Sequence, residues 1–155
     1  MSQQAAREEA ELVINGEGTI LGRLASYVAK LLLEGKRVTI VNAEKVAVSG
    51  DPVRVRQYYK QLILSVRSHY SEKWRPKRAR SPQRLVRKAV KGMLPKNQRG
   101  VEALRRLRVF VGVPKEYQGK QLLTLPENMT VKKLTRTKYV TLGDIARELG
   151  WRGGA

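Results

Sequence analysis

Residues 13–41, VINGEGTILGRLASYVAKLLLEGKRVTIV, predict a strand, a helix and a second strand in immediate succession. An apolar strand at the start leads through a turn cluster at 15–18 into a helix capped by Thr19. Gly35 supplies a left-handed stop for this helix, and the β-branched run 38–41 predicts a buried strand. The apolar residues of the helix recur at helical spacing: Ile20, Leu21, Leu24, Ala25, Val28, Leu31 and Leu32.

The rest of the chain continues this alternation, which indicates an α/β sheet covered by helices. The expected elements are a turn at 42–45, a strand at 46–48, a helix at 51–66, a loop at 67–80, helices at 81–94 and 99–106, a strand at 109–111, an irregular tail at 112–139 and a short helix at 141–149. The helix at 51–66 is expected to bury Val55, Tyr58, Tyr59, Leu62 and Val66. Thr141 and Asp144 predict a capping box for the last helix, whose apolar stripe is Leu142, Ile145, Ala146 and Leu149.

The positive charge of the chain is concentrated in its middle. The formal net charge is +19 over 155 residues. Residues 67–108 contain 15 Lys and Arg against two Glu, whereas residues 1–66 contribute only +2 and residues 109–155 only +4. Like charges at this density repel one another unless a polyanion neutralises them. Nucleic acid is the polyanion we expect, because each phosphate contact releases condensed counterions.

Composition argues against several classes of protein. The chain has no cysteine, so it has no disulfide framework or thiolate metal site, and it fits a reducing compartment. It contains no run of about 18 apolar residues, so no membrane span is expected. Residues 1–11 form a polar leader that lacks the basic start and apolar stretch of a signal peptide. We therefore expect a cytoplasmic protein, with membrane-surface binding through an amphipathic helix as a minor alternative.

The helix at 81–94 has two chemically different faces. At 100° per residue, four cations fall within an arc of roughly 100°: Arg84, Arg87, Lys88 and Lys91. The apolar residues fall on the opposite side: Leu85, Val86, Ala89, Val90 and Met93. A solvated basic surface is the ordinary interpretation, but surface helices usually interleave both signs and this one has no acidic partner at helical spacing. We therefore favour contact with phosphate.

The loop at 67–81 interleaves basic and aromatic side chains. Aromatic rings stack on unpaired bases, and arginine stacks or binds phosphate with its fork. Tyr70 and Trp74 are each more simply explained as anchors to the core, whereas the basic residues together favour RNA contact. From this loop we expect Arg67, Lys73, Trp74, Arg75, Lys77, Arg78 and Arg80 at the RNA, and the basic surface continues through Lys96, Arg99, Arg105 and Arg106.

No sequence pattern indicates catalysis or cofactor binding. His69, the only histidine, has no nucleophile pattern beside it, which argues against nucleophilic catalysis and a multi-histidine metal site. Gly16, Gly18 and Gly22 have the wrong spacing for a dinucleotide fingerprint, and residues 35–36 lack the upstream glycine of a P-loop. Scattered carboxylates form no magnesium cluster. We expect no enzyme activity, cofactor, metal or small-molecule substrate, and we expect the glycines to shape turns.

Several motifs resemble the large-subunit ribosomal protein 13 family. These motifs are VKGMLP at 90–95, RG at 99–100, AL at 103–104 and LRVFVG at 107–112, with GRLAS at 22–26, VNAEK at 41–45 and SG at 49–50. The resemblance covers about residues 12–118, and VTLGDIA at 140–146 is similar to the archaeal and eukaryotic branch. The short chain, without the glycine-rich stretch of bacterial members, favours an archaeal version. One departure is Val101, which stands where the family usually has a polar residue and which suggests core contact there.

The resemblance implies a three-layer α/β/α fold with a four-stranded, mainly parallel sheet. With the residue patterns, it suggests a core domain at 12–118 that includes the basic loop 67–81, and a C-terminal extension at 119–155 with a short helix at 141–149. It implies a structural role in the large ribosomal subunit, with large-subunit rRNA and neighbouring ribosomal proteins as partners. We expect phosphate and shape recognition to dominate over base readout, because A-form RNA hides its major groove.

Two other functions stay open at this point. An RNA-modifying or nucleotide-dependent enzyme would need a cofactor loop or a catalytic cluster, and the sequence shows neither. A regulatory protein that binds messenger RNA outside the ribosome is compatible with the sequence. Sedimentation with the large subunit at high salt would separate this regulator from a ribosomal component.

Overall fold

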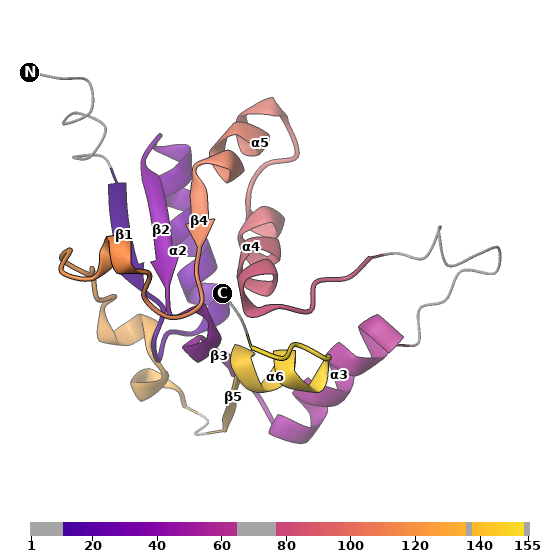
Figure 1. Cartoon of the computed structure of the whole chain (residues 1–155). Helices are drawn as coiled ribbons and strands as arrows, with labels where there is room; N and C mark the ends of the chain where they lie inside the picture. The colour runs from indigo at the N-terminus through magenta and orange to yellow at the C-terminus, as the bar shows by residue number, and fades with distance from the viewer. Residues whose placement is uncertain (1–10, 65–76, 136–137, 154–155) are drawn as a thin grey trace, which may run out of the picture.

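The computed structural model describes residues 11–64, 77–135 and 138–153. Its first elements are β1 (Glu11–Asn15), α2 (Leu21–Leu33) and β2 (Arg37–Val41). The two strands pair in parallel, with Leu12 opposite Val38 and Ile14 opposite Ile40. The predicted strand, helix and strand unit is therefore confirmed (Figure 1).

Helix α2 buries the predicted apolar stripe, except that Leu21 is half-buried. Its cap differs from the expectation: the N-cap residue is Ile20, and no side chain caps the helix. Thr19 is fully buried, and its hydroxyl donates to the carbonyl of Gly16 at 2.7 Å. The hydroxyl is therefore used by the preceding turn. Gly35 has a φ of +92°, as the predicted left-handed stop requires.

The main sheet has three parallel strands in the order β1-β2-β4, so the prediction of four strands is wrong. The strand predicted at 46–48 is β3 (Ala47–Ser49) in the structure. It pairs antiparallel with β5 (Tyr139–Thr141) in a separate sheet. Asn42 adopts a left-handed φ of 56°, and the 3₁₀ turn η1 (Ala43–Lys45) follows it. These residues redirect the chain after β2, so β3 does not join the parallel sheet.

Strand β4 (Leu107–Val109) begins two residues before its predicted position, directly after α5 (Gln98–Arg105). Leu107, which is 1% exposed, supplies its core contact. Phe110 still donates its amide to the Ile40 carbonyl at 2.8 Å, and the chain then turns at Gly112, where φ is +65°. The predicted strand at 109–111 therefore contains the end of β4 and the turn that follows it.

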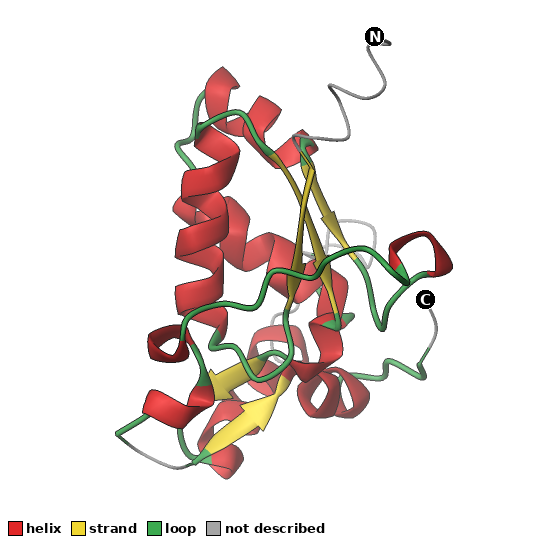
Figure 2. Cartoon of the chain, turned by 90° about the vertical axis from the view of Figure 1, so that its left-hand side faces the viewer, coloured by secondary structure: helices red, strands yellow, loops and turns green. Residues whose placement is uncertain are grey.

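The two faces of the sheet are covered differently (Figure 2). Ile14, Ile40 and Leu107 belong to the main core, which includes residues of α2 and α4 (Pro82–Met93). Val13 and Val41 belong to a smaller cluster with Tyr117 from η3 (Lys115–Tyr117). The layer on this second face is an irregular segment with a 3₁₀ turn, in place of the α-helix that a regular three-layer fold would have.

The tail continues along the edge of the sheet and into the core. Leu123 donates its amide to the Val13 carbonyl at 2.7 Å beside β1. Two further 3₁₀ turns follow, η4 (Glu127–Met129) and η5 (Val131–Lys133). Leu125 and Val140 then join the main core cluster. The segment that the sequence predicted to be irregular therefore includes a bridge to β1 and the partner strand of β3.

Helices α3 (Pro52–Leu64) and α6 (Leu142–Glu148) lie together beside the small sheet (Figure 1). Thr141 caps α6 as predicted, since the amide of Asp144 donates to Thr141 Oγ1 at 3.3 Å, and the Thr141 hydroxyl in turn donates to the Asp144 carboxylate at 2.8 Å. The predicted stripe of α6 is buried. Arg56 and Lys60 of α3 both pair with Glu148 of α6, at 3.2 and 3.0 Å.

The prediction that α3 buries its apolar side chains holds only in part, since Val55, Tyr59 and Leu62 are half-buried and Tyr58 is 59% exposed. Val55, Tyr59 and Ile63 pack against the core at an i, i+4 spacing. Tyr58 lies beside this stripe and so faces outward. Val66 lies outside the described residues.

Gly100 sets the approach of α5 to the end of α4. A Cβ at this position would lie 1.9 Å from the Pro95 carbonyl oxygen. We predict that Gly100→Ala lowers the free energy of unfolding by about 2 kcal/mol, because backbone must move. Gly92→Ala is the control, since its Cβ would meet no atom within 4 Å and should stabilise the helix. Equal urea midpoints for the two variants would contradict this explanation.

Glu11 gives a pH-dependent link between β1, β2 and the tail. Its Oε1 accepts bonds from Thr39 Oγ1 at 2.8 Å and from Tyr117 Oη at 3.0 Å. Burial raises the pKa of this carboxyl, but the two bonds and the charges of Lys120 and Arg108 outweigh burial and leave the pKa below 4.5.

A pKa that is lower in the folded state makes the carboxylate stabilising above the unfolded pKa, and this stabilisation is lost as the pH falls through the folded value. We therefore predict that Glu11→Gln is less stable than the wild type at neutral pH and that the difference shrinks below pH 4.5. Urea unfolding across this range would measure it. Exposed Glu116→Gln is the control, and a constant difference for Glu11→Gln would contradict the assignment.

Candidate nucleic-acid interface

Helix α4 is fixed in place by its apolar face. It begins at Pro82 after Ser81 and ends at Met93, before Leu94, whose backbone is extended. Leu85, Val86 and Val90 are buried in the main core, and the helix packs against α2. The structure therefore confirms the predicted direction of the apolar face.

The opposite face of α4 presents all four predicted cations. Arg84, Arg87, Lys88 and Lys91 are exposed, and Ala89 is half-buried. Met93, predicted on the apolar side, is 46% exposed because it lies in the last turn, where it lines a surface hollow with Arg99. The two-faced character of the helix thus holds for all but its last turn.

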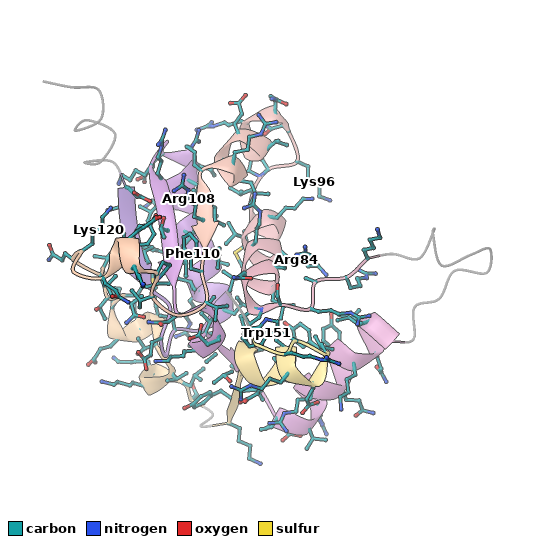
Figure 3. All side chains as sticks on the ribbon, in the orientation of Figure 1. Arg84, Lys96, Arg108, Phe110, Lys120 and Trp151 are labelled. Atoms are coloured by element: carbon teal, nitrogen blue, oxygen red, sulfur yellow. The ribbon has the colours of Figure 1, made fainter. Side chains whose placement is uncertain are left out.

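The four cations line one open groove together with residues from two other segments. The residues that line this cation groove are Lys77, Arg78, Ala79, Arg84, Arg87, Lys88, Lys91 and Leu104. Residues 77–79 come from the segment before α4, and Leu104 comes from α5. Arg84 is labelled on α4 in Figure 3. Of the eight described residues that line the groove, six are cations and none is acidic.

Among the described residues, no carboxylate forms an ion pair with a cation of the cation groove. Within the described ranges, the ion pairs join Lys36 with Glu34, Lys45 with Glu17, Arg56 and Lys60 with Glu148, and Arg147 with Asp144. None of these pairs includes a cation of the groove. A bound polyanion would therefore reduce the mutual repulsion of these six charges.

Arg87 differs from its neighbours because it also bonds within the protein. Its two terminal nitrogens donate to the backbone carbonyls of Leu107 at 3.2 Å and Leu104 at 3.4 Å. These carbonyls lie where α5 passes into β4. Arg87 therefore joins α4 to the next two elements and also lines the cation groove.

Two further arginines predicted at the RNA bind the last turn of α2. Arg106 Nη2 donates to the Leu32 carbonyl at 2.8 Å, and Arg99 Nη2 donates to the Leu33 carbonyl at 3.3 Å. Carbonyls at a helix C-terminus lack intrahelical partners and carry partial negative charge, which suits a guanidinium. Arg106 is half-buried. The sequence contains no local signal for these bonds, since donor and acceptor lie far apart along the chain.

The remaining predicted residues divide into three groups. Arg80 and Arg105 are exposed but do not line the cation groove. Lys96 is exposed in the loop between α4 and α5, on the side of the molecule opposite Lys120 (Figure 3). The predicted residues Arg67, Lys73, Trp74 and Arg75 lie outside the described residues, as do His69 and Tyr70.

The expected core contact of Val101 is wrong, because this side chain is 49% exposed. It lies on the outer side of α5, whereas Gly100 and Ala103 of the same helix are buried. The helical period places the buried side of α5 at positions 100 and 103, so position 101 faces outward.

The described residues offer no alternative site for a metal or for a nucleotide-binding glycine loop. No group of three His, Cys, Asp or Glu among them is placed to hold a metal ion. Gly16 packs closely, since a Cβ there would lie 2.9 Å from Val46 Cγ2, and Gly18 has a φ of +67°. These glycines shape the turn after β1, as predicted. None of the helices in the described ranges has the length and apolar character to cross a membrane.

Comparison with known proteins agrees with the family resemblance. The sequence model of the family described as Ribosomal protein L13 matches residues 9–116. A protein named Large ribosomal subunit protein uL13 from Aeropyrum pernix is 55% identical, over 97% of this chain and 96% of its own length. Proteins of the same name from Saccharolobus solfataricus and Archaeoglobus fulgidus are 44% and 45% identical, over 94% and 91% of this chain and 97% and 88% of their own lengths.

These relatives are archaeal, so both the predicted family and the predicted branch are confirmed. The matched segment includes β1 to α5, and therefore the whole of α4 and its cations. Because the family match covers most of the chain and the relatives align over nearly its full length, the chain belongs to the ribosomal protein L13 family.

Proposed function

We propose that this chain is a structural component of the large ribosomal subunit in the cytoplasm, where it binds large-subunit rRNA. The observation that carries the proposal is the cation groove, where the described lining residues include six cations and no carboxylate. The names of the relatives support the assignment to the large subunit. The role needs no catalytic group, because neutralising phosphates and matching the shape of the RNA are sufficient to hold RNA segments together.

The proposed contact surface is centred on α4. A rigid helix packed on the core holds Arg84, Lys88 and Lys91 in fixed relative positions, so less entropy is lost on binding than for a free basic tail. Lys77 and Arg78 extend the surface toward the basic segment that precedes α4. Arg80, Lys96 and Arg105 remain proposed RNA contacts outside the groove. Arg67, Lys73, Trp74 and Arg75, which lie outside the described residues, also remain proposed RNA contacts, and neighbouring ribosomal proteins remain proposed partners.

The groove predicts a specific change in the salt dependence of RNA binding. We expect the combined variant Arg84→Ala, Lys88→Ala and Lys91→Ala to fold normally, because all three side chains are exposed and none forms an ion pair within the described part of the chain. Its affinity for large-subunit rRNA should fall, and the slope of log affinity against log salt should flatten by roughly 0.7–0.9 for each lost phosphate contact.

A charge-matched variant provides the control. Lys132, Lys133 and Lys138 are exposed and do not line the groove. Replacing these three by alanine removes the same charge, so a general field effect would weaken both variants equally. Equal salt slopes in the two variants would remove the groove from the interface. Arg87 is kept in both variants because of its bonds to Leu104 and Leu107.

The assignment to the ribosome itself is tested by sedimentation. Tagged protein expressed in its own cells should remain with the large subunit after a high-salt wash, at about one copy per subunit. Release into the light fractions would contradict the structural role and would favour the regulatory protein that binds RNA outside the ribosome.

A further inference from the structure

A second hollow adjoins the cation groove, between α3 and α4. Its apolar lining includes Tyr58, Tyr59, Ile63, Leu85, Ala89 and Gly92, and we call it the aromatic hollow. Arg78, Ala79 and Lys88 line both this hollow and the cation groove. The two hollows are therefore adjacent, one apolar and one cationic, and Arg78 and Lys88 lie on the border between them.

The aromatic hollow exposes ring surface that the fold leaves available. Tyr58 is 59% exposed, although its position on α3 predicted burial. Its ring meets the Tyr59 ring edge to face, with centroids 5.7 Å apart and an interplanar angle of 84°. This contact holds Tyr58 with one ring face free of Tyr59.

Gly92 keeps the opposite side of the hollow open. It lies in α4, and a Cβ built there would have no atom within 4 Å. Glycine in a helix costs roughly 1 kcal/mol relative to alanine. No described atom packs close enough to Gly92 to require a glycine there. Because Gly92 lines the hollow, the missing side chain leaves the hollow wider.

We propose that the aromatic hollow receives one unpaired RNA base whose phosphate lies in the cation groove. This inference rests on the proposed function and identifies the kind of RNA element that the groove takes. A nucleotide combines an anion with a flat, largely apolar base, and the adjacent hollows offer cations on one side and aromatic and aliphatic surface on the other. Bases displaced from a helix are commonly bound by stacking on aromatic side chains.

The border between the hollows favours a nucleotide over an apolar protein segment. Arg78 and Lys88 lie at the junction, so an occupant of the hollow passes directly from apolar surface to positive charge. A nucleotide makes this change within one residue. The proposed base contact adds to the phosphate contacts of the cation groove. Because a base within a helix is stacked and paired, this contact favours unpaired RNA over helical RNA.

The test compares two short probes of equal charge and length, an oligouridylate and an abasic ribose-phosphate chain, bound to the full-length protein. Wild-type protein should bind the oligouridylate about ten-fold more tightly, as one aromatic stacking contact predicts. Tyr58→Ala removes the ring, and Gly92→Leu fills the hollow while improving helix propensity. Both variants should bring the ratio of affinities close to one and leave the salt slope unchanged.

Tyr139→Ala is the matched control, because Tyr139 is also an exposed tyrosine, 44% exposed, but lies on β5 outside the hollow. It should keep the wild-type ratio. Thermal unfolding of each variant would establish that the fold is retained.

Three results would overturn the inference. A wild-type ratio near one, with salt-dependent binding of both probes, would leave the cation groove as an RNA site and assign the hollow to an apolar side chain of a neighbouring protein. An unchanged ratio in both hollow variants would place the base contact elsewhere. Failure of the wild type to bind either probe, with release from the large subunit at high salt, would overturn the proposed function as well.

Discussion

The packing of α4 on α2 and the main sheet is the constraint on which the rest of the structure depends. Leu85, Val86 and Val90 are almost completely buried in the main core. Because the helix has a period of 3.6 residues, burying these side chains forces Arg84, Lys88 and Lys91 to the outside. Hydrophobic burial on one face therefore positions a cluster of like charges on the other, which electrostatics alone would disperse.

Some arginines of this basic region bind backbone carbonyls within the protein, whereas others present their charge at the surface, and the sequence does not distinguish the two roles. Arg99 and Arg106 donate to carbonyls at the end of α2, and Arg87 donates to carbonyls between α5 and β4. Arg106 adds a second donor to the Leu32 carbonyl, which also accepts from the Gly35 amide at 3.1 Å, so its guanidinium joins the end of α2 to the residue before β4. Within the described ranges, the lysines of the cation groove form no ion pair, so their charge is available to an external partner.

Most elements of the fold could be predicted because their signals are local. The stripe of α2, the Thr141 and Asp144 capping box and the two faces of α4 all depend on spacings within a single helix. Two of the wrong predictions, the sheet that β3 joins and the burial of Tyr58, concern partners distant in the chain. β3 pairs with β5 and is therefore not part of the main sheet. Tyr58 is exposed because α3 packs against the core through Val55 and Tyr59.

The amino-acid sequence alone was sufficient to identify the α/β class, the basic helix and the family, because periodicity, charge placement and motifs are properties of order along the chain. Only the tertiary structure decided that residues 77–79, α4 and Leu104 form one groove and that α3 adds an aromatic hollow to it. A groove is defined by side chains that meet across space. Their meeting depends on how segments far apart in the chain pack, and no short-range pattern encodes that packing.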